Sequence, residues 1–322
     1  MENEETLDYL RSGSWISGEE MAQQLGISRA AVWKHIKNLR SRGYRIESST
    51  NRGYRLTYSP DILDANKICS ELKTKFIGRD LHCYQEVKST NEVARSMARS
   101  SNDGTVVLAE IQTAGRGRMS RAWASPYGGI WMSLILKPKI ALANAYKVNM
   151  AVSVALSRAV ASLYGLKACI KWPNDLLIND RKVCGILMEI SAEIDRLEYA
   201  VIGIGINANV DVEAFPDEWK ATSISRELGS EISRIELIQR VLQEIEDAYC
   251  KMDSQEIYRE WCDRSATLGR RVRINSAAGD FDGEAISLSE DGALLVKASG
   301  NLLRVVAGDC IHLRNLRGSE MA

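Results

Sequence analysis

The pattern of apolar and polar residues changes along the chain, and each change predicts a different architecture. Residues 1–60 predict two short helices, one at 17–25 and one that Ser28 caps, with Gly26 as the break between them. In the second helix the apolar residues recur every three or four positions, which places them on one face: Val32, Ile36 and Leu39. We expect this helix to end at Gly43.

Two short strand patterns follow, at residues 44–47 and 54–57, around a turn at 51–53. A helix, a glycine-containing turn, a basic helix and a hairpin form the layout of a winged helix-turn-helix. Such a unit places its second helix in the major groove of DNA and its basic hairpin on the phosphate backbone. The alternative is a small helical domain that binds another protein.

The middle of the chain alternates strand and helix patterns, which predicts an α+β or α/β domain with a mixed sheet. A short helix at 64–72 connects it to the first segment, and the spacing of Ser89 and Glu92 is that of a capping box at the start of another helix. The clearest segments are strands at 105–112, 129–137, 168–172, 182–191 and 198–207, and helices at 146–164 and within 234–264.

The last part of the chain consists of short strand patterns separated by glycines. They fall at residues 270–275, 280–288, 293–298, 302–306 and 310–313. Short strands with this punctuation predict a small closed β-barrel of the SH3-like kind. With 322 residues the chain is long enough for three domains, and we expect them at 1–62, 63–267 and 268–322. The fold class is therefore α+β multidomain: winged helix-turn-helix head, mixed-sheet α/β domain, C-terminal β-barrel.

Charge sharpens the first prediction. The chain has 42 basic and 42 acidic residues, yet between Arg29 and Arg55 eight basic residues accompany one acid, Glu47. Clustered positive charge attracts phosphate backbones, although charge alone would also fit a solvated basic face. Together with the winged-helix pattern, it makes these residues candidates for DNA contact: Ser28, Arg29, Trp33, Lys34, Lys37 and Arg52.

Composition excludes several other classes of site. The seven cysteines form no CxxC pair, and the three histidines are isolated in sequence. These residues therefore argue against a disulfide framework, a zinc site and a Ser-His-Asp triad. The N-terminus is acidic, unlike a signal peptide, and no apolar run is long enough for a membrane span. We expect a cytoplasmic protein with no membrane partner.

The most unusual stretch follows the strand at 105–112. Two glycines alternate with Arg116 and Arg118, and Arg121 and Trp123 come shortly after. Glycine exposes backbone N–H groups to a ligand, guanidinium groups grip carboxylates and phosphates, and an indole can stack on a purine. The pattern predicts a loop that holds an anionic ligand with an aromatic ring. It is not a P-loop, because GxxxxGK[ST] is absent from the chain.

A second stretch, Lys-Trp-Pro-Asn-Asp at 171–175, ends a strand with proline and predicts an exposed turn. Asn174 and Asp175 could there contact a nucleotide or Mg²⁺, although both residues are also common in ordinary turns. Lys182 leads into the next strand, towards the same face of the sheet; a plain surface lysine is the alternative.

Gly203, Gly205 and Ala208 formally satisfy the dinucleotide-binding pattern GxGxxA. In a dinucleotide-binding fold a helix follows directly after the glycine motif. Here residues 210–216 are irregular and end in proline. We therefore interpret the two glycines as room for a flat ligand packed on the sheet.

Together these motifs resemble the bacterial biotin–protein ligases: Ser-Thr-Asn at 89–91, Gly-Arg-Gly-Arg at 115–118, Lys-Trp-Pro-Asn-Asp at 171–175 and Gly-Ile-Gly-Ile-Asn at 203–207. The basic winged head makes the chain most similar to the bifunctional type, which also represses biotin synthesis genes. The resemblance covers essentially the full chain.

The resemblance implies a role for each matching residue. Biotin would be held by Ser89, Thr90, Asn91, Gln112, Arg116, Gly117, Arg118 and Lys182, of which Arg118 and Lys182 would also be catalytic. The nucleotide would be contacted by Arg118, Arg121, Trp123 and Asn174, and Asp175 could help to place Mg²⁺. The chain departs from the family where another Arg-Gly usually follows the Gly-Arg-Gly-Arg run, because Met119 and Ser120 stand there. This departure concerns how tightly the loop closes.

The implied reaction is ATP-dependent formation of biotinyl-5'-AMP and transfer of biotin to a lysine of a biotin carboxyl carrier protein. The expected substrates are biotin and ATP with Mg²⁺, and the expected partners are the carrier protein, operator DNA and a second copy of the chain in a ligand-promoted homodimer. Two alternatives stay open from the residues: a lipoate–protein ligase, and a repressor whose central domain only senses an effector.

Overall fold

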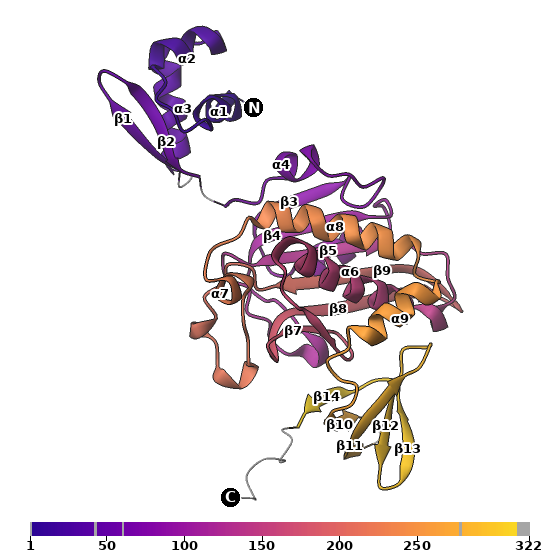
Figure 1. Ribbon diagram of the computed structural model, residues 1–322. Coiled ribbons are helices and arrows are strands. Elements are labelled where there is room, and N and C mark those ends of the chain that lie inside the picture. Colours follow the sequence, from indigo (N-terminus) through magenta and orange to yellow (C-terminus); the bar gives the residue numbers. More distant parts are fainter. Residues whose placement is uncertain (1, 42–43, 60, 277–278, 314–322) are drawn as a thin grey trace, which may run out of the picture. The chain divides into compact units, whose positions relative to one another are not determined.

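The computed structural model describes residues 2–41, 44–59, 61–276 and 279–313. By their internal contacts the residues form two units, Met1–Ile62 and Leu63–Ala322 (Figure 1). The expected helix end at Gly43 and the final residues 314–322 lie outside the described part.

The first unit is a helix-turn-helix with a hairpin, as its apolar pattern predicts. Ser17 and Ser28 begin the second and third helices, because their hydroxyls accept hydrogen bonds from the backbone N–H of Glu20 and Ala31 at 3.0 and 3.2 Å. Gly26 ends the second helix in the left-handed conformation. The apolar face of the third helix is at most 1% exposed: Val32, Ile36 and Leu39. The elements are α1 (Glu2–Leu10), α2 (Gly18–Leu25), α3 (Arg29–Ser41), β1 (Arg45–Ser49) and β2 (Gly53–Tyr58).

One glycine fixes the hairpin against the rest of this unit. Ile16 and Tyr54 exchange two backbone hydrogen bonds of 2.8 and 3.0 Å, which adds a short third strand to the hairpin. Gly53 has a φ of +89°, and a Cβ there would lie 2.0 Å from the carbonyl oxygen of Ile16. Only glycine fits both the backbone angle and the close approach.

The second unit is built on a mixed seven-stranded sheet of order β3-β4-β5-β9-β8-β7-β6. Strands β3 and β4 are parallel, and the other neighbours are antiparallel. The predicted mixed sheet is therefore confirmed. Its strands are β3 (Leu81–Val87), β4 (Thr105–Gln112), β5 (Ile130–Leu136), β6 (Cys169–Lys171), β7 (Asp175–Ile178), β8 (Arg181–Glu193) and β9 (Arg196–Ile206).

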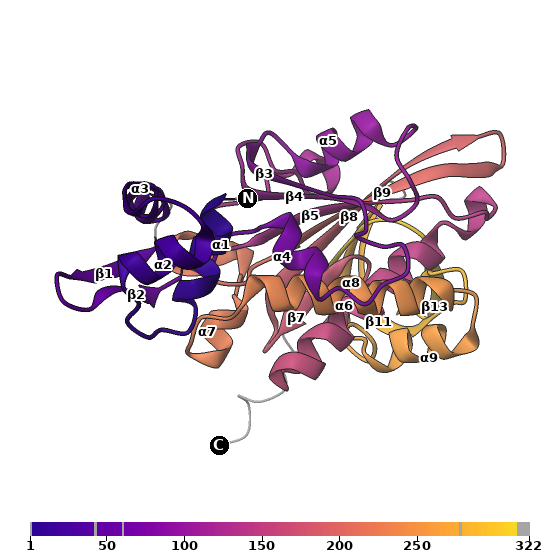
Figure 2. The ribbon, with the colours of Figure 1, turned by 90° about the horizontal axis from the view of Figure 1, so that it is seen from above.

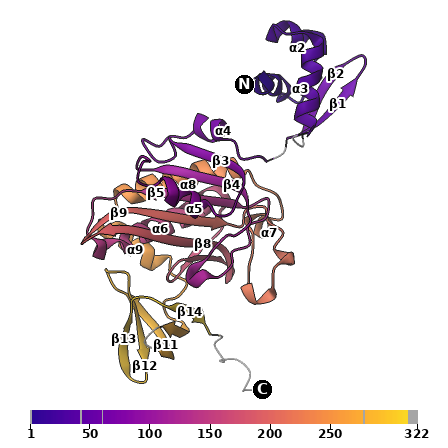
Figure 3. The same ribbon diagram turned by 180° about the vertical axis from the view of Figure 1, so that it is seen from behind.

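Helices cover both faces of this sheet (Figures 2 and 3). Helix α5 (Thr90–Met97) packs on β4, β5 and β9, while α6 (Tyr146–Tyr164) lies on the opposite face beneath α8 (Arg234–Cys250) and α9 (Gln255–Asp263). Eleven of the 19 residues of α6 are buried, as its all-round apolar pattern predicts for a helix between two layers. The remaining helices are α4 (Ala65–Ser70) and α7 (Ile224–Leu228), with short 3₁₀ turns at Arg118–Ser120, Leu142–Asn144, Val212–Ala214 and Asp217–Trp219.

The C-terminal segment of the second unit is a five-stranded antiparallel sheet of order β13-β12-β11-β10-β14. All five strands lie where the glycine-punctuated pattern predicts them. They are β10 (Arg271–Ser276), β11 (Gly279–Leu288), β12 (Leu294–Ala298), β13 (Asn301–Val305) and β14 (Asp309–His312).

The helix expected from the spacing of Ser89 and Glu92 does begin at Thr90, but it has no capping box, because Ser89 makes no side-chain cap hydrogen bond. The backbone N–H of Thr90 donates instead to Gln112 of β4, and Glu92 pairs with Arg116. Asp175 does not lie on an exposed turn: it begins β7, where it pairs with Lys171 of β6. Within the described residues, none of the helices has the length and apolar character needed to cross a membrane.

Candidate functional site

One cavity of about 550 Å³ brings the predicted site residues together on the second unit. Its floor comes from β8 and β9, one wall from the start of α5 and the end of β4, and another from β10 and β14 of the C-terminal sheet. The lining includes every residue expected to bind biotin, nucleotide or metal: Ser89, Thr90, Asn91, Gln112, Arg116, Gly117, Arg118, Arg121, Trp123, Asn174, Asp175 and Lys182. The structure therefore gathers segments that are far apart in sequence.

A network of short hydrogen bonds holds the polar side chains at one end of this cavity. The Gln112 carbonyl accepts from the Thr90 backbone N–H at 2.8 Å and from its hydroxyl at 3.1 Å, and the Gln112 amide donates to Ser125 at 2.8 Å. The Ser133 hydroxyl lies 2.7 Å from Thr90 Oγ1. Thr90 and Ser133 are at most 3% exposed. This end is preorganised, because each side chain is fixed by another.

Asn91 extends the network towards the sheet. Its amide donates to Glu189 at 2.8 Å, and its carbonyl oxygen lies 2.6 Å from the Ser133 hydroxyl. Gly203 of β9 passes directly beneath, and a Cβ on it would lie 2.3 Å from Asn91 Oδ1. Gly203 therefore leaves space for a side chain of the protein itself, so Asn91 fills room that the sequence assigned to a ligand.

The Gly-Arg-Gly-Arg segment forms a small hairpin over the cavity. Backbone hydrogen bonds join Trp123 to Gly115 at 2.9 Å and Gly117 to Arg121 at 2.7 Å. Met119, which departs from the family pattern, stands at the tip with a φ of +53° and is 72% exposed. The segment therefore has defined structure at its base and an exposed tip.

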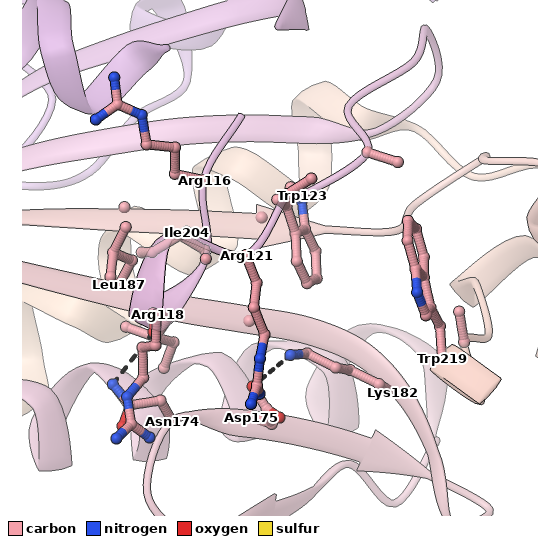
Figure 4. Close-up of a pocket in the computed structure, with 18 of the residues that line it drawn as sticks. Arg116, Arg118, Arg121, Trp123, Asn174, Asp175, Lys182, Leu187, Ile204 and Trp219 are labelled. Atoms are coloured by element: carbon pink, nitrogen blue, oxygen red, sulfur yellow. Dashed lines mark hydrogen bonds and ion pairs between the residues drawn. The ribbon is translucent and has the colours of Figure 1, made fainter. Parts of the chain in front are cut away.

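The arginines of this hairpin point in different directions. Arg116 points away from the cavity centre in Figure 4 and forms an ion pair with Glu92 of α5. Arg118 donates to the carbonyl oxygen of Gly308 at 2.9 Å, and Arg121 forms an ion pair with Asp309. Gly308 and Asp309, at the start of β14, thus hold two of the three guanidinium groups at the rim of the cavity.

Trp123 lies flat on the floor of the cavity. A Cβ on Gly205 would lie 2.5 Å from the indole nitrogen, and one on Gly185 would lie 3.0 Å from the ring. The flat group over the glycines is therefore the indole of the protein, whereas the sequence predicted a ligand there. The indole N–H faces the sheet at Gly205, and it is buried with no hydrogen-bond partner among the described residues.

Lys182 and Asp175 meet at the opposite end of the cavity (Figure 4). The Lys182 ammonium lies 2.7 Å from Asp175 Oδ1 and 4.9 Å from the centre of the Trp123 ring. Asn174, beside them, donates to the Ile186 carbonyl at 3.2 Å and accepts from the Ile186 N–H at 2.8 Å through its backbone. Lysine, indole and carboxylate are thus held together over β7, β8 and β9.

Sequence reasoning missed several residues that line the cavity. Lys171 adds a further cation, and Asn207 has a buried side-chain oxygen with no partner among the described residues. Trp172 and Trp219 add two indoles beside Trp123. Lys171 and Asn207 lie inside motifs that were singled out. Trp219 follows the irregular, proline-containing segment after β9. That irregular segment was the only local feature that could have drawn attention to it.

The described lining of the cavity supplies cationic side chains, but it supplies neither an ionised thiol nor a preformed metal site. Within the described part of the chain, no group of three His, Cys, Asp or Glu side chains could hold a metal ion. Burial raises the pKa of the Cys310 thiol to about 11, partly offset by Lys171, so this cavity-lining cysteine stays protonated. The arrangement can bind an anion and stabilise charge, and it needs no covalent enzyme intermediate.

The first unit presents a separate candidate site for nucleic acid. Ser28, Arg29, Trp33, Lys34, Lys37 and Arg52 are all exposed. On α3, Lys37 lies over the Trp33 ring at 5.4 Å, and Arg29 forms an exposed ion pair with Glu19 at 3.4 Å. In the hairpin, Arg52 and Arg55 both lie over the Trp15 ring, at 5.2 and 5.0 Å. Trp15 is a residue that the sequence did not single out, and it orients the two hairpin arginines.

Three family models match the chain. The Biotin/lipoate A/B protein ligase family matches residues 83–207, an HTH domain matches residues 4–55, and the biotin protein ligase C terminal domain matches residues 267–313. Each match covers the part of the chain where the corresponding architecture is observed.

Similar proteins agree with these matches. The chain is 39% identical to the "Bifunctional ligase/repressor BirA" of Bacillus subtilis over 92% of this chain and 93% of the relative. It is 28% identical to the protein of the same name in Escherichia coli, over 95% of each chain. Among solved structures, the biotin protein ligase from Aquifex aeolicus in complex with biotin and ATP matches with a TM-score of 0.63 and 28% identity, covering 74% of this chain and all of that one.

Proposed function

This chain belongs to the family of bifunctional biotin ligase/repressors, and on that premise we propose that its main cavity joins biotin to ATP. In this proposal the Thr90–Gln112 end receives the ureido ring of biotin, because it offers fixed hydroxyl and amide groups. Ser89 and Asn91 complete that end. The biotin carboxylate then extends along the floor towards Lys182.

The nucleotide occupies the other part of the cavity. Its adenine packs against Trp123 and Trp219, two of the three tryptophans among the described residues that line the cavity. Its phosphates lie among Arg118, Arg121 and Lys182, and Asn174, which lines the same cavity, contacts them. Arg116 and Gly117 belong to the hairpin that closes over the ligand.

The chemistry follows from charge. An oxygen of the biotin carboxylate attacks the α-phosphorus of ATP, the new C(O)O–P bond forms, and pyrophosphate leaves with the electrons of the broken P–O bond. Two anions must approach each other, so cationic side chains fixed around the reacting atoms lower the barrier. Lys182 and Arg118 supply this charge in the proposal, and positioning supplies the rest.

Mg²⁺ is part of the proposal as a companion of ATP. Magnesium usually takes one or two protein carboxylates and otherwise binds phosphates and water. Asp175 is a suitable carboxylate, because it lines the cavity and pairs with Lys182 through its Oδ1 oxygen. When bound, the ion would neutralise phosphate charge.

The acceptor in the proposal is a lysine of a biotin carboxyl carrier protein, which attacks the activated carbonyl and releases AMP. One observation carries the whole scheme: Lys182 and the arginine hairpin share a cavity with a preorganised set of amide and hydroxyl groups. Mixing the protein with ATP, biotin and a carrier domain tests it. We expect the mass of biotin, less one water, to appear on one carrier lysine; an unchanged carrier mass would refute the scheme.

We also propose that ligand binding promotes a homodimer, and that the dimer binds operator DNA through α3 and the hairpin of the first unit. A winged helix on a palindromic site gains affinity when two copies bind together. The proposed compartment is the cytoplasm, where the seven free cysteines stay reduced. Sedimentation velocity with biotin and ATP should show a larger species, and an unchanged sedimentation coefficient would contradict the dimer.

A further inference from the structure

A second, smaller cavity of about 210 Å³ adjoins the main one. It lies between α6, α9 and the C-terminal sheet, with Asn149 and Met150 from α6 and Trp261 from α9 among its lining residues. We propose that this cavity receives the side chain of the acceptor lysine. The inference rests on the proposed ligase function and goes beyond it by giving the second substrate its own entrance.

The two cavities share a boundary. Arg118, Pro173, Asn174 and Leu187 line both of them, and Figure 4 shows the Arg118 and Asn174 side chains close together. A group that enters the smaller cavity therefore arrives at the place where Arg118 and the Lys-Trp-Pro-Asn turn meet the main ligand.

A separate entrance is required by the order of events. When biotinyl-adenylate forms, it fills the main cavity from the Thr90–Gln112 end to the indoles, and its acyl carbon lies between these two parts. The acceptor amine must reach that carbon without displacing the adenylate. Because the smaller cavity opens at the shared boundary rather than at either end, it meets this requirement.

The lining of the smaller cavity suits a lysine side chain. Tyr146, Trp172 and Trp261 provide aromatic walls, and Met150 is also apolar. Apolar walls cover the four methylene groups of a lysine while its amine reaches further. Among the described residues, Asn149 Oδ1 is a buried oxygen with no hydrogen-bond partner. An unpartnered acceptor of this kind can receive one N–H of the amine.

Charge at the boundary favours the reactive form of the amine. Among the described residues that line the cavity, Arg118 and Tyr146 are ionisable and none carries a carboxylate. A neighbouring guanidinium disfavours an ammonium ion, so it increases the fraction of neutral amine. The nitrogen lone pair then attacks the acyl carbon, the C–O bond to phosphate breaks, AMP leaves, and the nitrogen releases one proton to solvent.

Val306 provides a way to block this entrance without touching the main cavity. It lines the smaller cavity and is 64% exposed, so it lies at the rim. We expect Val306→Trp to form biotinyl-adenylate at the wild-type rate, measured as pyrophosphate release. Transfer of biotin from the adenylate to a folded carrier domain should slow at least tenfold, while transfer to hydroxylamine, a small nucleophile, should stay unchanged.

The matched control is Leu302→Trp, on β13 of the same sheet, because Leu302 is 60% exposed and belongs to neither cavity lining. It should transfer biotin to the carrier at the wild-type rate. Wild-type carrier transfer by Val306→Trp would overturn the inference, as would an equal loss of adenylate formation. Absence of adenylate from the wild-type protein would instead refute the proposed function.

A second variant tests the role of Asn149 by its pH profile. Asn149→Asp places a carboxylate beside the amine, which favours the ammonium form. The pH of half-maximal carrier transfer should therefore rise by about one unit, while the pH profile of adenylate formation stays in place. Parallel shifts of both profiles, or no shift in either, would show that Asn149 does not face the amine.

Discussion

The two ends of the arginine-covered cavity are built in different ways. At the Thr90–Gln112 end, Thr90, Asn91 and Ser133 are at most 7% exposed and bonded to one another or to neighbours. At the hairpin, by contrast, the Arg116 and Arg121 side chains are 55% and 66% exposed, and their partners are single carboxylates. The Thr90–Gln112 end is therefore fixed by its neighbours, whereas the hairpin carries exposed charged side chains.

This difference indicates how the two substrates are recognised. A buried network of fixed side chains discriminates by shape and hydrogen bonding, because any misfit leaves polar groups unpaired. Exposed guanidinium groups with single ion-pair partners can exchange a carboxylate for a phosphate at little cost, since exposed ion pairs contribute little free energy. We therefore expect substitutions at the rigid end to have larger effects than substitutions of the hairpin partners.

The largest effect on biotin affinity in this comparison should come from a methyl group placed beneath the Thr90–Gln112 end. Gly203→Ala puts a Cβ 2.3 Å from Asn91 Oδ1, so the network must shift. Overpacking of this kind costs about 1–3 kcal/mol, and calorimetry should show the Kd for biotin rising about tenfold to a hundredfold. Gly117→Ala is the matched control in the hairpin, because its nearest contact is an ordinary 3.6 Å; similar losses in both variants would remove the contrast.

A middle-sized effect is expected from Ser133→Ala. This change removes the hydroxyl that links Thr90 to Asn91 and leaves buried partners unsatisfied, which costs about 1–2 kcal/mol. Biotin affinity should fall about tenfold. Ser96→Ala, which removes an exposed hydroxyl bonded to its own helix, should leave the affinity unchanged, and an unchanged affinity in Ser133→Ala would contradict the preorganised network.

The smallest effect is expected from Glu92→Gln, which frees Arg116 from its exposed ion pair. Such pairs contribute about 0.2–1 kcal/mol, so the KM for biotin in pyrophosphate release should change less than about fivefold. The difference should shrink further in 0.5 M salt, because salt screens exposed charges. A hundredfold change in this KM that did not depend on salt would contradict the prediction, because Arg116 would then behave like the fixed side chains of the Thr90–Gln112 end.

The sequence predicts this fold well where local signals are strong. Helix α6 is found at its exact residues because Gly165 ends it in the left-handed conformation after a long apolar run. Strand β4 is found at its own residues because most of its positions are apolar. Strand β7 was missed because it has only four residues and follows proline. Short segments of that kind take their conformation from neighbouring strands rather than from their own pattern.

The candidate site also contains residues that local signals predict and residues that they do not. Glycine-arginine alternation and the Lys-Trp-Pro-Asn-Asp motif are local signals, and all their expected site residues line the cavity. The role of Ser133 could not be predicted, because nothing in the sequence of an apolar strand indicates which residues its serine will bond. Asp309 could not be predicted either, because its partner Arg121 is 188 residues away. Such contacts exist only once the chain has folded.

Pyrophosphate release by Lys182→Ala tests the central claim most directly, because it isolates the step in which two anions join. Loss of a fixed charge at a developing anion lowers rates about a hundredfold to a thousandfold, and we predict a loss of this size with the unfolding temperature unchanged. Lys297→Ala removes an exposed lysine elsewhere and should be normal. Near-normal biotin-dependent pyrophosphate release by Lys182→Ala would contradict the account.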